Sequence, residues 1–213
     1  MRVVVAAYKG GTGKTTAAVA LAEAGAHWRG SALLVDADPQ ASAMRWAEMA
    51  ADDGGSGLRS VVVSLPTRDL ARRLAGLRAD DYPLTVVDCP PGSEPITAAA
   101  LDGADVAVVT CRPAVGDLDR AWPTLEAAES AGVPSLVLLT MTRTRTRSLE
   151  ATRSVLADAG VNVADVTVPQ REAIAAAWGT RPGRELLDIG EQLIRATTST
   201  LKRHKRSTRR AQF

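Results

Sequence analysis

Residues 3–20, VVVAAYKGGTGKTTAAVA, join an apolar β-branched run to a helical pattern through a glycine-rich loop. This order is typical of a phosphate-binding loop, because glycines let backbone N–H groups surround an anion at the positive end of a helix. Residues 13–15 match the end of the pattern G-x-x-x-x-G-K-[ST], which requires glycine at position 8. The chain has Tyr8 there, and a second lysine, Lys9, follows it.

The residue types in this loop predict how a nucleotide would be held. Lys14 is expected to reach the terminal phosphates, and the Thr15 hydroxyl to hold Mg²⁺. Thr16 is expected to donate to the α-phosphate. The predicted nucleotide-binding residues of the loop are Lys9, Gly10, Gly11, Thr12, Gly13, Lys14, Thr15 and Thr16. A glycine-rich turn without a ligand is the alternative, but the strand, loop and helix in register argue against it.

Short apolar runs alternate with longer amphipathic segments along the chain, which indicates βαβ units. We expect strands near 2–7, 32–36, 59–63, 84–88, 105–111, 134–140 and 162–168, and helices near 14–29, 40–51, 67–77, 94–102, 117–131, 148–159, 171–177 and 184–204. The strands are continuous β-branched runs, so both sheet faces should be covered. The sequence predicts a single doubly wound, mostly parallel α/β sheet with helices on both faces, spanning residues 1–200.

Acidic residues follow two of the predicted strands. LLVDADPQ places Asp36 and Asp38 at one strand exit, and LTVVDCPPG places Asp88 at another. Carboxylates at the ends of parallel strands, beside a phosphate loop, can hold a metal ion or orient a water. For each aspartate alone, a turn or helix cap is the alternative. Together with the loop, the three carboxylates predict a Mg²⁺ site.

The net charge of +2 hides an uneven distribution. Residues 201–213, LKRHKRSTRRAQF, hold six of the 26 basic residues and none of the 24 acidic ones, so we treat them as a basic C-terminal tail. Such a tail suggests contact with a polyanion such as DNA, and a solvated terminus is the alternative. The predicted DNA contacts are Lys202, Arg203, Lys205, Arg206, Arg209 and Arg210. A second set, Arg143, Arg145, Arg147 and Arg153, is expected to extend the same footprint, and a solvated loop and helix face is the alternative.

Membrane and metal-cluster functions are disfavoured. No stretch is long and apolar enough to cross a bilayer, and the tail lacks the apolar stripe of a membrane-inserting helix. Cys89 and Cys111 lack metal-ligand spacing and are interpreted as buried, reduced thiols. We therefore expect a cytoplasmic protein without stable membrane association.

Residues 9–16, KGGTGKTT, resemble the deviant Walker A motif KGGxGKTT of the ParA/MinD family of P-loop ATPases, in which an extra lysine replaces the leading glycine. LLVDADPQ resembles the second motif of that family, and VVDCPPG its Walker B motif. Residues 168–188 resemble its C-terminal pattern, with alanine at position 176 where the family has an acid. The resemblance covers residues 2–190 or so. Because the chain begins at the ATPase strand, without a helix-turn-helix extension, it resembles small partition ATPases such as ParF.

This resemblance implies catalytic roles. Lys9 would reach across a nucleotide-sandwich dimer and neutralise charge that develops on the partner's phosphates. Asp38 would position the attacking water, so that Lys9, Lys14 and Asp38 form the expected catalytic set. Asp36 and Asp88 would organise Mg²⁺ through its waters, with Thr15 as a direct ligand.

The resemblance also implies an adenine pocket around Met141, Thr142 and Pro169. It implies a Mg²⁺-dependent ATPase that forms a homodimer with ATP, binds nucleoid DNA without sequence preference, and is released when a ParB-like adaptor stimulates hydrolysis to ADP. Plasmid or chromosome partition is the expected task. Positioning of another cargo, such as a carboxysome or chemotaxis cluster, is an alternative. A MinD-like membrane ATPase and a metabolic P-loop enzyme stay open.

Overall fold

The computed structural model describes residues 1–52, 57–92 and 94–211. Within these residues, seven strands form one sheet in the order β3-β2-β4-β1-β5-β6-β7, and every neighbouring pair is parallel. The strands are β1 (Arg2–Ala6), β2 (Leu33–Asp36), β3 (Val61–Ser64), β4 (Thr85–Asp88), β5 (Val106–Cys111), β6 (Ser135–Thr142) and β7 (Val168–Pro169). The predicted doubly wound fold is confirmed.

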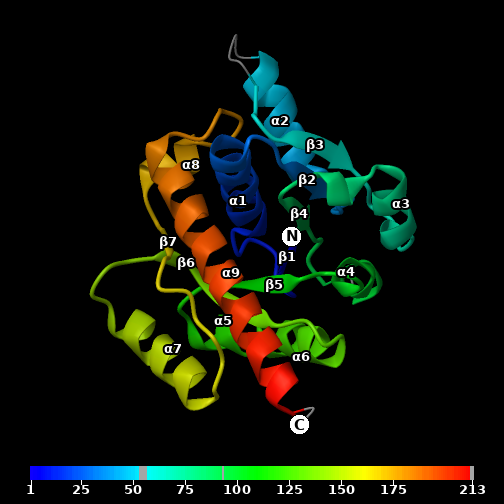
Figure 1. Cartoon of the computed structure of the whole chain (residues 1–213). Helices are drawn as coiled ribbons and strands as arrows, with labels where there is room; N and C mark the ends of the chain where they lie inside the picture. Colours follow the sequence, from blue (N-terminus) through cyan, green and yellow to red (C-terminus); the bar gives the residue numbers. More distant parts are fainter. Residues whose placement is uncertain (53–56, 93, 212–213) are drawn as a thin grey trace.

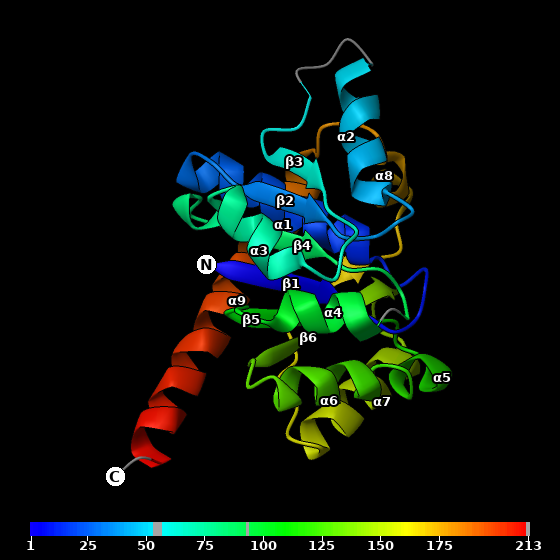
Figure 2. The same ribbon diagram turned by 90° about the vertical axis from the view of Figure 1, so that its right-hand side faces the viewer.

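Helices cover both faces of this sheet (Figures 1 and 2). They are α1 (Lys14–Arg29), α2 (Ser42–Asp52), α3 (Leu70–Gly76), α4 (Glu94–Leu101), α5 (Val115–Leu118), α6 (Trp122–Ser130), α7 (Arg147–Asp158), α8 (Glu172–Ala176) and α9 (Arg184–Ala211), with a 3₁₀ turn η1 (Ala79–Asp81). Alternation along β1 sorts the layers: Val3 and Val5 pack with α1 and α9, and Val4 and Ala6 pack with α3 and α4.

Helices α1 and α9 lie against each other on one face of the sheet (Figure 1). Gly190 makes this close approach possible, because a Cβ atom there would lie 2.0 Å from the Ala20 carbonyl oxygen and 2.8 Å from the Ala24 Cβ. Small residues on both helices therefore fix how closely α9 can pack.

We expect Gly190→Val to destabilise the fold by about 3 kcal/mol, because the added atoms must push α9 away from α1. Urea unfolding would measure the loss. Gly183→Ala is the matched control, since a Cβ at Gly183 would meet no atom within 4 Å. Equal stability of the Gly190→Val variant and wild type would show that the helices pack less closely than described.

Two predicted elements differ from the structure. The expected strand 162–168 is wrong for most of its length: an isolated bridge pairs Val163 with Val137, and β7 then contains only Val168 and Pro169. The expected helix 117–131 is divided into α5 and α6, because Pro123 lies in the first turn of α6, where its missing N–H is tolerated.

Helix α9 is longer than expected, since it runs through to Ala211 instead of ending at residue 204. Its last turns leave the body at the amino edge of the sheet, the lower left of Figure 2, whereas the strands end on the right. A contact of Arg203 locates these turns: its guanidinium donates to Asn162 Oδ1 at 3.4 Å. The carbonyl oxygen of Asn162 in turn accepts the N–H of Val137, in the amino half of β6. The basic C-terminal segment is thus a helix extension through Ala211.

Candidate nucleotide site

The loop between β1 and α1 has the backbone geometry that a phosphate cradle needs. Gly11 and Gly13 have φ values of 70° and 76°, in the left-handed region that glycine adopts without strain. Gly13 is the N-cap of α1, and its carbonyl accepts the first helical hydrogen bond from Ala17 N–H at 3.0 Å. Backbone N–H groups at the start of α1 are therefore available to an anion.

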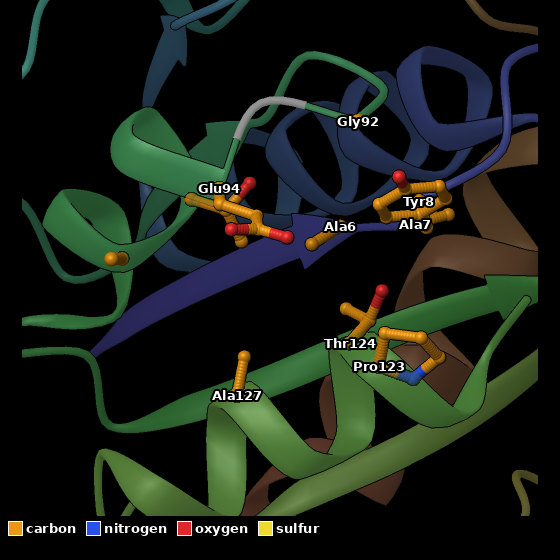
Figure 3. Close-up of a pocket in the computed structure, with 10 residues that line it drawn as sticks. Ala6, Ala7, Tyr8, Gly92, Glu94, Pro123, Thr124 and Ala127 are labelled. Carbon is orange, nitrogen blue, oxygen red and sulfur yellow. The ribbon is translucent and has the colours of Figure 1, made fainter.

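Tyr8, which stands where the standard pattern has glycine, does not fill the loop. It lines a cavity of about 200 Å³ between α4 and α6, on the side of the sheet away from α1 (Figure 3). The departure from the pattern is therefore compatible with a phosphate loop.

Two threonines that sequence reasoning missed hold this loop in place. The Thr12 hydroxyl lies 2.9 Å from the Thr110 hydroxyl at the end of β5, and the Thr140 hydroxyl of β6 donates to the Thr12 carbonyl oxygen at 2.8 Å. All three side chains are buried. In the sequence, the only indication of these contacts is that both threonines are polar residues near the ends of apolar strands. That Thr12 is their partner follows from the strand order, which the sequence pattern does not give.

Lys14 lies within the loop with only 7% of the residue exposed. Its ammonium donates to the Lys9 carbonyl oxygen at 3.3 Å. Burial lowers the pKa of Lys14, while the nearby carboxylates of Asp88 and Asp38 oppose that shift. A buried cation at the base of an anion cradle favours a phosphate ligand.

The predicted metal residues Asp36 and Asp88 lie side by side, because they are register partners on neighbouring strands β2 and β4. Alternation along each strand turns both toward the α1 face, where the loop begins. The two oxygens of Asp36 accept backbone N–H groups of Asp38 at 3.1 Å and Met44 at 2.9 Å. Burial raises the pKa of Asp36, and these hydrogen bonds oppose the rise.

Asp88 is 1% exposed, and neither carboxylate oxygen accepts a hydrogen bond of normal geometry from the described residues. Burial raises its pKa to about 7, although the nearby Thr15 hydroxyl and Lys14 lower it. The described residues contain no cluster of three or more acidic, histidine or cysteine groups that could hold a metal alone. An orphaned carboxylate beside a hydroxyl fits Mg²⁺, which takes few protein ligands and keeps waters and nucleotide phosphates.

The nucleotide-free protein should lose stability as the pH rises from about 4 to about 7. Over this range the folded state keeps a proton on Asp88 that the unfolded chain releases, so higher pH favours unfolding. The free energy of unfolding should therefore differ between pH 5 and pH 8, and Asp88→Asn should remove up to about 3 kcal/mol of that difference. Urea unfolding at both pH values, with exposed Asp102→Asn as control, measures this. If the unfolding free energy of Asp88→Asn depended on pH as that of wild type does, Asp88 would not be the group that holds the proton.

Asp38 lies two residues after the end of β2, at the carboxyl edge of the sheet. Its Oδ1 accepts the Gln40 N–H at 2.9 Å, and its charge is near enough to Lys14 to affect that residue's pKa. The side chain is partly exposed, so it can reach a bound molecule. It is thus placed at the same edge as the loop and the buried aspartates.

A cavity of about 310 Å³ continues from the loop past the ends of β6 and β7. Met141 and Pro169 line it as expected, and Met141 stands at a register shift of β6 with φ of 50°. Thr142 does not line the cavity: it is buried and donates to the Thr167 hydroxyl at 3.0 Å. The cavity also includes Gly13, Thr16, Trp46, Thr140, Val168, Gln170, Arg171, Ile174, Ala175 and Trp178.

Two aromatic residues that sequence reasoning missed form part of this cavity. The rings of Trp46 and Trp178 are 5.0 Å apart between centroids, and the Trp46 indole donates to the Thr180 carbonyl oxygen at 2.8 Å. An apolar, aromatic cavity next to a phosphate cradle has the character of a base pocket. Trp46 belongs to α2 and Trp178 to the segment after α8, so the two residues are far apart in the sequence and lie together only in the folded chain.

Lys9, the second lysine of the loop, is paired within its own chain. Its ammonium contacts the carboxylate of Asp117 in α5, and 32% of its side chain stays exposed. The structure therefore places Lys9 at the open carboxyl edge of the sheet, beside the loop that follows β5.

The two predicted basic sets lie at opposite edges of the sheet. Arg143, Arg145 and Arg147 follow the carboxyl end of β6, whereas the end of α9 borders the segment that precedes β6. β6 has eight residues and so spans about 26 Å. The two sets are therefore separated along the sheet, and a shared footprint stays a prediction. Arg153 instead donates to the backbone carbonyls of Ala164 and Asp165.

A parallel sheet of this order, with a glycine loop after its central strand, is the fold of a P-loop nucleotide-binding protein. The model of the CobQ/CobB/MinD/ParA nucleotide binding domain matches residues 3–181, and the chain belongs to this family. The predicted resemblance to ParA and MinD proteins is confirmed, and membership supports a general ATPase activity.

Individual relatives differ in their tasks. The chain is 39% identical over 152 residues to maintenance of carboxysome distribution protein A of Gloeobacter kilaueensis, covering 69% of this chain and 67% of that protein. It is 36% identical over 132 residues to the chromosome-partitioning ATPase Soj of Thermus thermophilus, covering 51% and 53%. A protein from Borrelia burgdorferi, solved with AMPPNP bound, has a TM-score of 0.77 at 15% identity, covering 93% of this chain and 98% of that chain, and shows the shared fold.

Proposed function

We propose that this protein is a Mg²⁺-dependent ATPase that dimerises with ATP, binds DNA without sequence preference and positions a cargo along it. The observation that carries the proposal is the place of Lys9, which lies outside the loop at the carboxyl edge of the sheet with 32% of its side chain exposed. A lysine confined to its own nucleotide would be expected inside the loop, as Lys14 is.

The residues divide the work of hydrolysis. Lys14 binds the terminal phosphates, Asp38 orients the attacking water, and the partner's copy of residue 9 offsets charge that develops on the transferred phosphoryl group. Thr15, Asp36 and Asp88 would hold Mg²⁺, which would supply charge neutralisation at the phosphate oxygens. The cavity with Met141, Pro169 and the two tryptophans receives adenine.

The relatives favour one cargo class over another. The relative at 39% identity is named for carboxysome distribution, whereas the partition ATPase Soj aligns with about half of the chain. We therefore place the positioning of a carboxysome-like cargo ahead of plasmid or chromosome partition, which remains the second candidate. In either case a cargo-bound adaptor, ParB-like in the second, would stimulate hydrolysis at the nucleoid.

The end of α9 supports the DNA contact. Thr200, Arg203, His204 and Ser207 line a groove against α6, so they face the body. Lys202, Lys205, Arg206 and Arg209, spaced i, i+3, i+4 and i+7, form the opposite stripe and are exposed. No described helix is long and apolar enough to cross a membrane. A cationic stripe without an apolar one favours phosphates over lipid.

In a dimer joined through the carboxyl edges, the two stripes lie at its outer ends. ATP would then strengthen DNA binding by linking two distant sites, without merging them into one patch. Arg143, Arg145 and Arg147, near the joined edges, are the second predicted contact set.

Replacing the four stripe cations with alanine should weaken ATP-dependent DNA binding and reduce its salt slope by up to about 0.9 for each phosphate that is no longer neutralised. Fluorescence anisotropy with unrelated duplexes over a salt series measures this. The matched control removes four exposed cations around α3: Arg68, Arg72, Arg73 and Arg78. If the control weakened binding as much as the stripe variant, net charge would explain the effect, and the stripe would not be the DNA site.

A further inference from the structure

The hydroxyl of Thr140 contacts the backbone of the phosphate loop from a different part of the chain. Thr140 is fully buried in β6. Its hydroxyl lies 2.8 Å from the Thr12 carbonyl oxygen and 3.4 Å from the Cys111 carbonyl oxygen, so the Thr12 carbonyl is its main acceptor. A side chain of β6 therefore fixes one peptide group of the loop.

That peptide group joins Thr12 to Gly13, and it is trans like the other described peptide bonds. In a planar trans peptide the C=O and N–H bonds point in opposite directions. Because the carbonyl points toward Thr140, the Gly13 N–H points away from it. Among the described residues, no group accepts a hydrogen bond from this N–H. The N–H is thus free to bind an anion at the N-cap of α1.

Glycine at position 13 allows this peptide a second orientation. Rotation of the peptide by half a turn would take the φ of Gly13 from 76° to about −104°, and glycine populates both regions about equally readily. The rotated peptide would direct the Thr12 carbonyl oxygen, which carries a partial negative charge, into the cradle. The loop backbone alone therefore does not select the orientation that accepts phosphate.

We infer that Thr140 makes this selection, because its hydroxyl holds the peptide with the Gly13 N–H toward the bound phosphates. Thr140 is a positioning residue that acts through the Thr12–Gly13 peptide. The Thr110 hydroxyl, 2.9 Å from the Thr12 hydroxyl, steadies the same residue from β5. This inference rests on the proposed function, since it concerns how the phosphates of the nucleotide are recognised at the same site.

Removing the hydroxyl without changing the shape of the side chain should weaken phosphate binding. Affinity falls with the fraction of molecules in the binding-competent orientation, and one hydrogen bond shifts such an equilibrium by about two- to tenfold. Thr140→Val should therefore weaken inorganic diphosphate and ADP by the same factor, about two- to tenfold. Thr140→Ser keeps the hydroxyl and should bind both as wild type does. Titration calorimetry with Mg²⁺ present measures the four affinities.

Thr142 provides a matched control in the same strand. It is buried, and its hydroxyl donates to the Thr167 hydroxyl at 3.0 Å, away from the loop. Thr142→Val makes the same chemical change and should leave both affinities unchanged. Thr140→Cys differs from Thr140→Ser mainly in having a weaker donor, so it should bind diphosphate less tightly. That pair tests the inference even if Thr140→Val folds poorly, and urea unfolding checks the folded fraction of each protein.

The two ligands separate two failures. If wild type binds neither ADP nor diphosphate, the proposed function fails together with this inference. If wild type binds both and Thr140→Val binds them equally well, only the role of Thr140 is overturned. A loss for ADP alone would place the effect in the base cavity, which Thr140 also lines, and would overturn the inference.

Three other results would also overturn it. An equal loss in Thr142→Val would show that any missing hydroxyl in β6 has the same effect. Equal diphosphate affinities of Thr140→Ser and Thr140→Cys would show that the donor does not orient the peptide. Wild type that binds ADP but no diphosphate would show that the cradle is not set before the nucleotide arrives.

Discussion

Lys14→Ala should abolish measurable nucleotide binding. The ammonium of Lys14 is buried in the loop, so its removal deletes charge-assisted hydrogen bonds to phosphate and leaves the negative charges of ATP beside Asp88 and Asp38. We expect a loss of affinity of at least about a hundredfold for both ATP and ADP, measured by titration calorimetry.

Two further variants test the role of Mg²⁺ and provide a control for the loss of a lysine. Thr15→Ala should retain nucleotide binding but lose the part of the affinity that depends on Mg²⁺. Lys205→Ala, which removes an exposed lysine at the far edge of the sheet, should bind as wild type does. Unchanged affinity in Lys14→Ala would refute the phosphate-loop assignment.

Lys9→Ala should have a different effect, which separates this protein from P-loop enzymes that work as single subunits. ADP binding to the monomer should be nearly unchanged, because the side chain of Lys9 lies outside the loop on Asp117. ATP-dependent dimerisation should be lost. Adaptor-stimulated hydrolysis should fall by about 10³-fold, the scale expected when a trans-acting cation is removed. Light scattering and phosphate release measure the two effects. Loss of ADP binding in Lys9→Ala would contradict the separation of roles.

The sequence was enough to predict the fold and the elements around the phosphate loop. The continuous β-branched runs and the glycine loop are local signals, and the carboxylates meet because parallel strands end at one edge. The partners Thr110, Thr140 and Asp117 could not be found in this way, since each interaction depends on β5 and β6 following β1 in the sheet. The tryptophan cavity likewise joins α2 to a segment more than a hundred residues later.

Local rules also failed for the end of α9. A run of cations without acids suggested a tail, yet lysine and arginine have high helix propensity and α9 simply continues to Ala211. The helix direction then carries the cations to the amino edge, away from Arg143 and its neighbours. Sequence spacing alone contains no information on that separation.

Mixing two inactive variants, Lys9→Ala and Asp38→Ala, tests directly whether Lys9 acts on the partner's nucleotide. Asp38→Ala should bind ATP and accumulate as a long-lived dimer, because Asp38 matters mainly in the transition state. If Lys9 acts across the interface, a mixed dimer has one composite site with both lesions and one with neither. Hydrolysis should therefore recover partly in the mixture, toward half the wild-type rate per mixed dimer. No recovery, with mixed dimers shown to form, would contradict action across the interface and confine Lys9 to its own subunit.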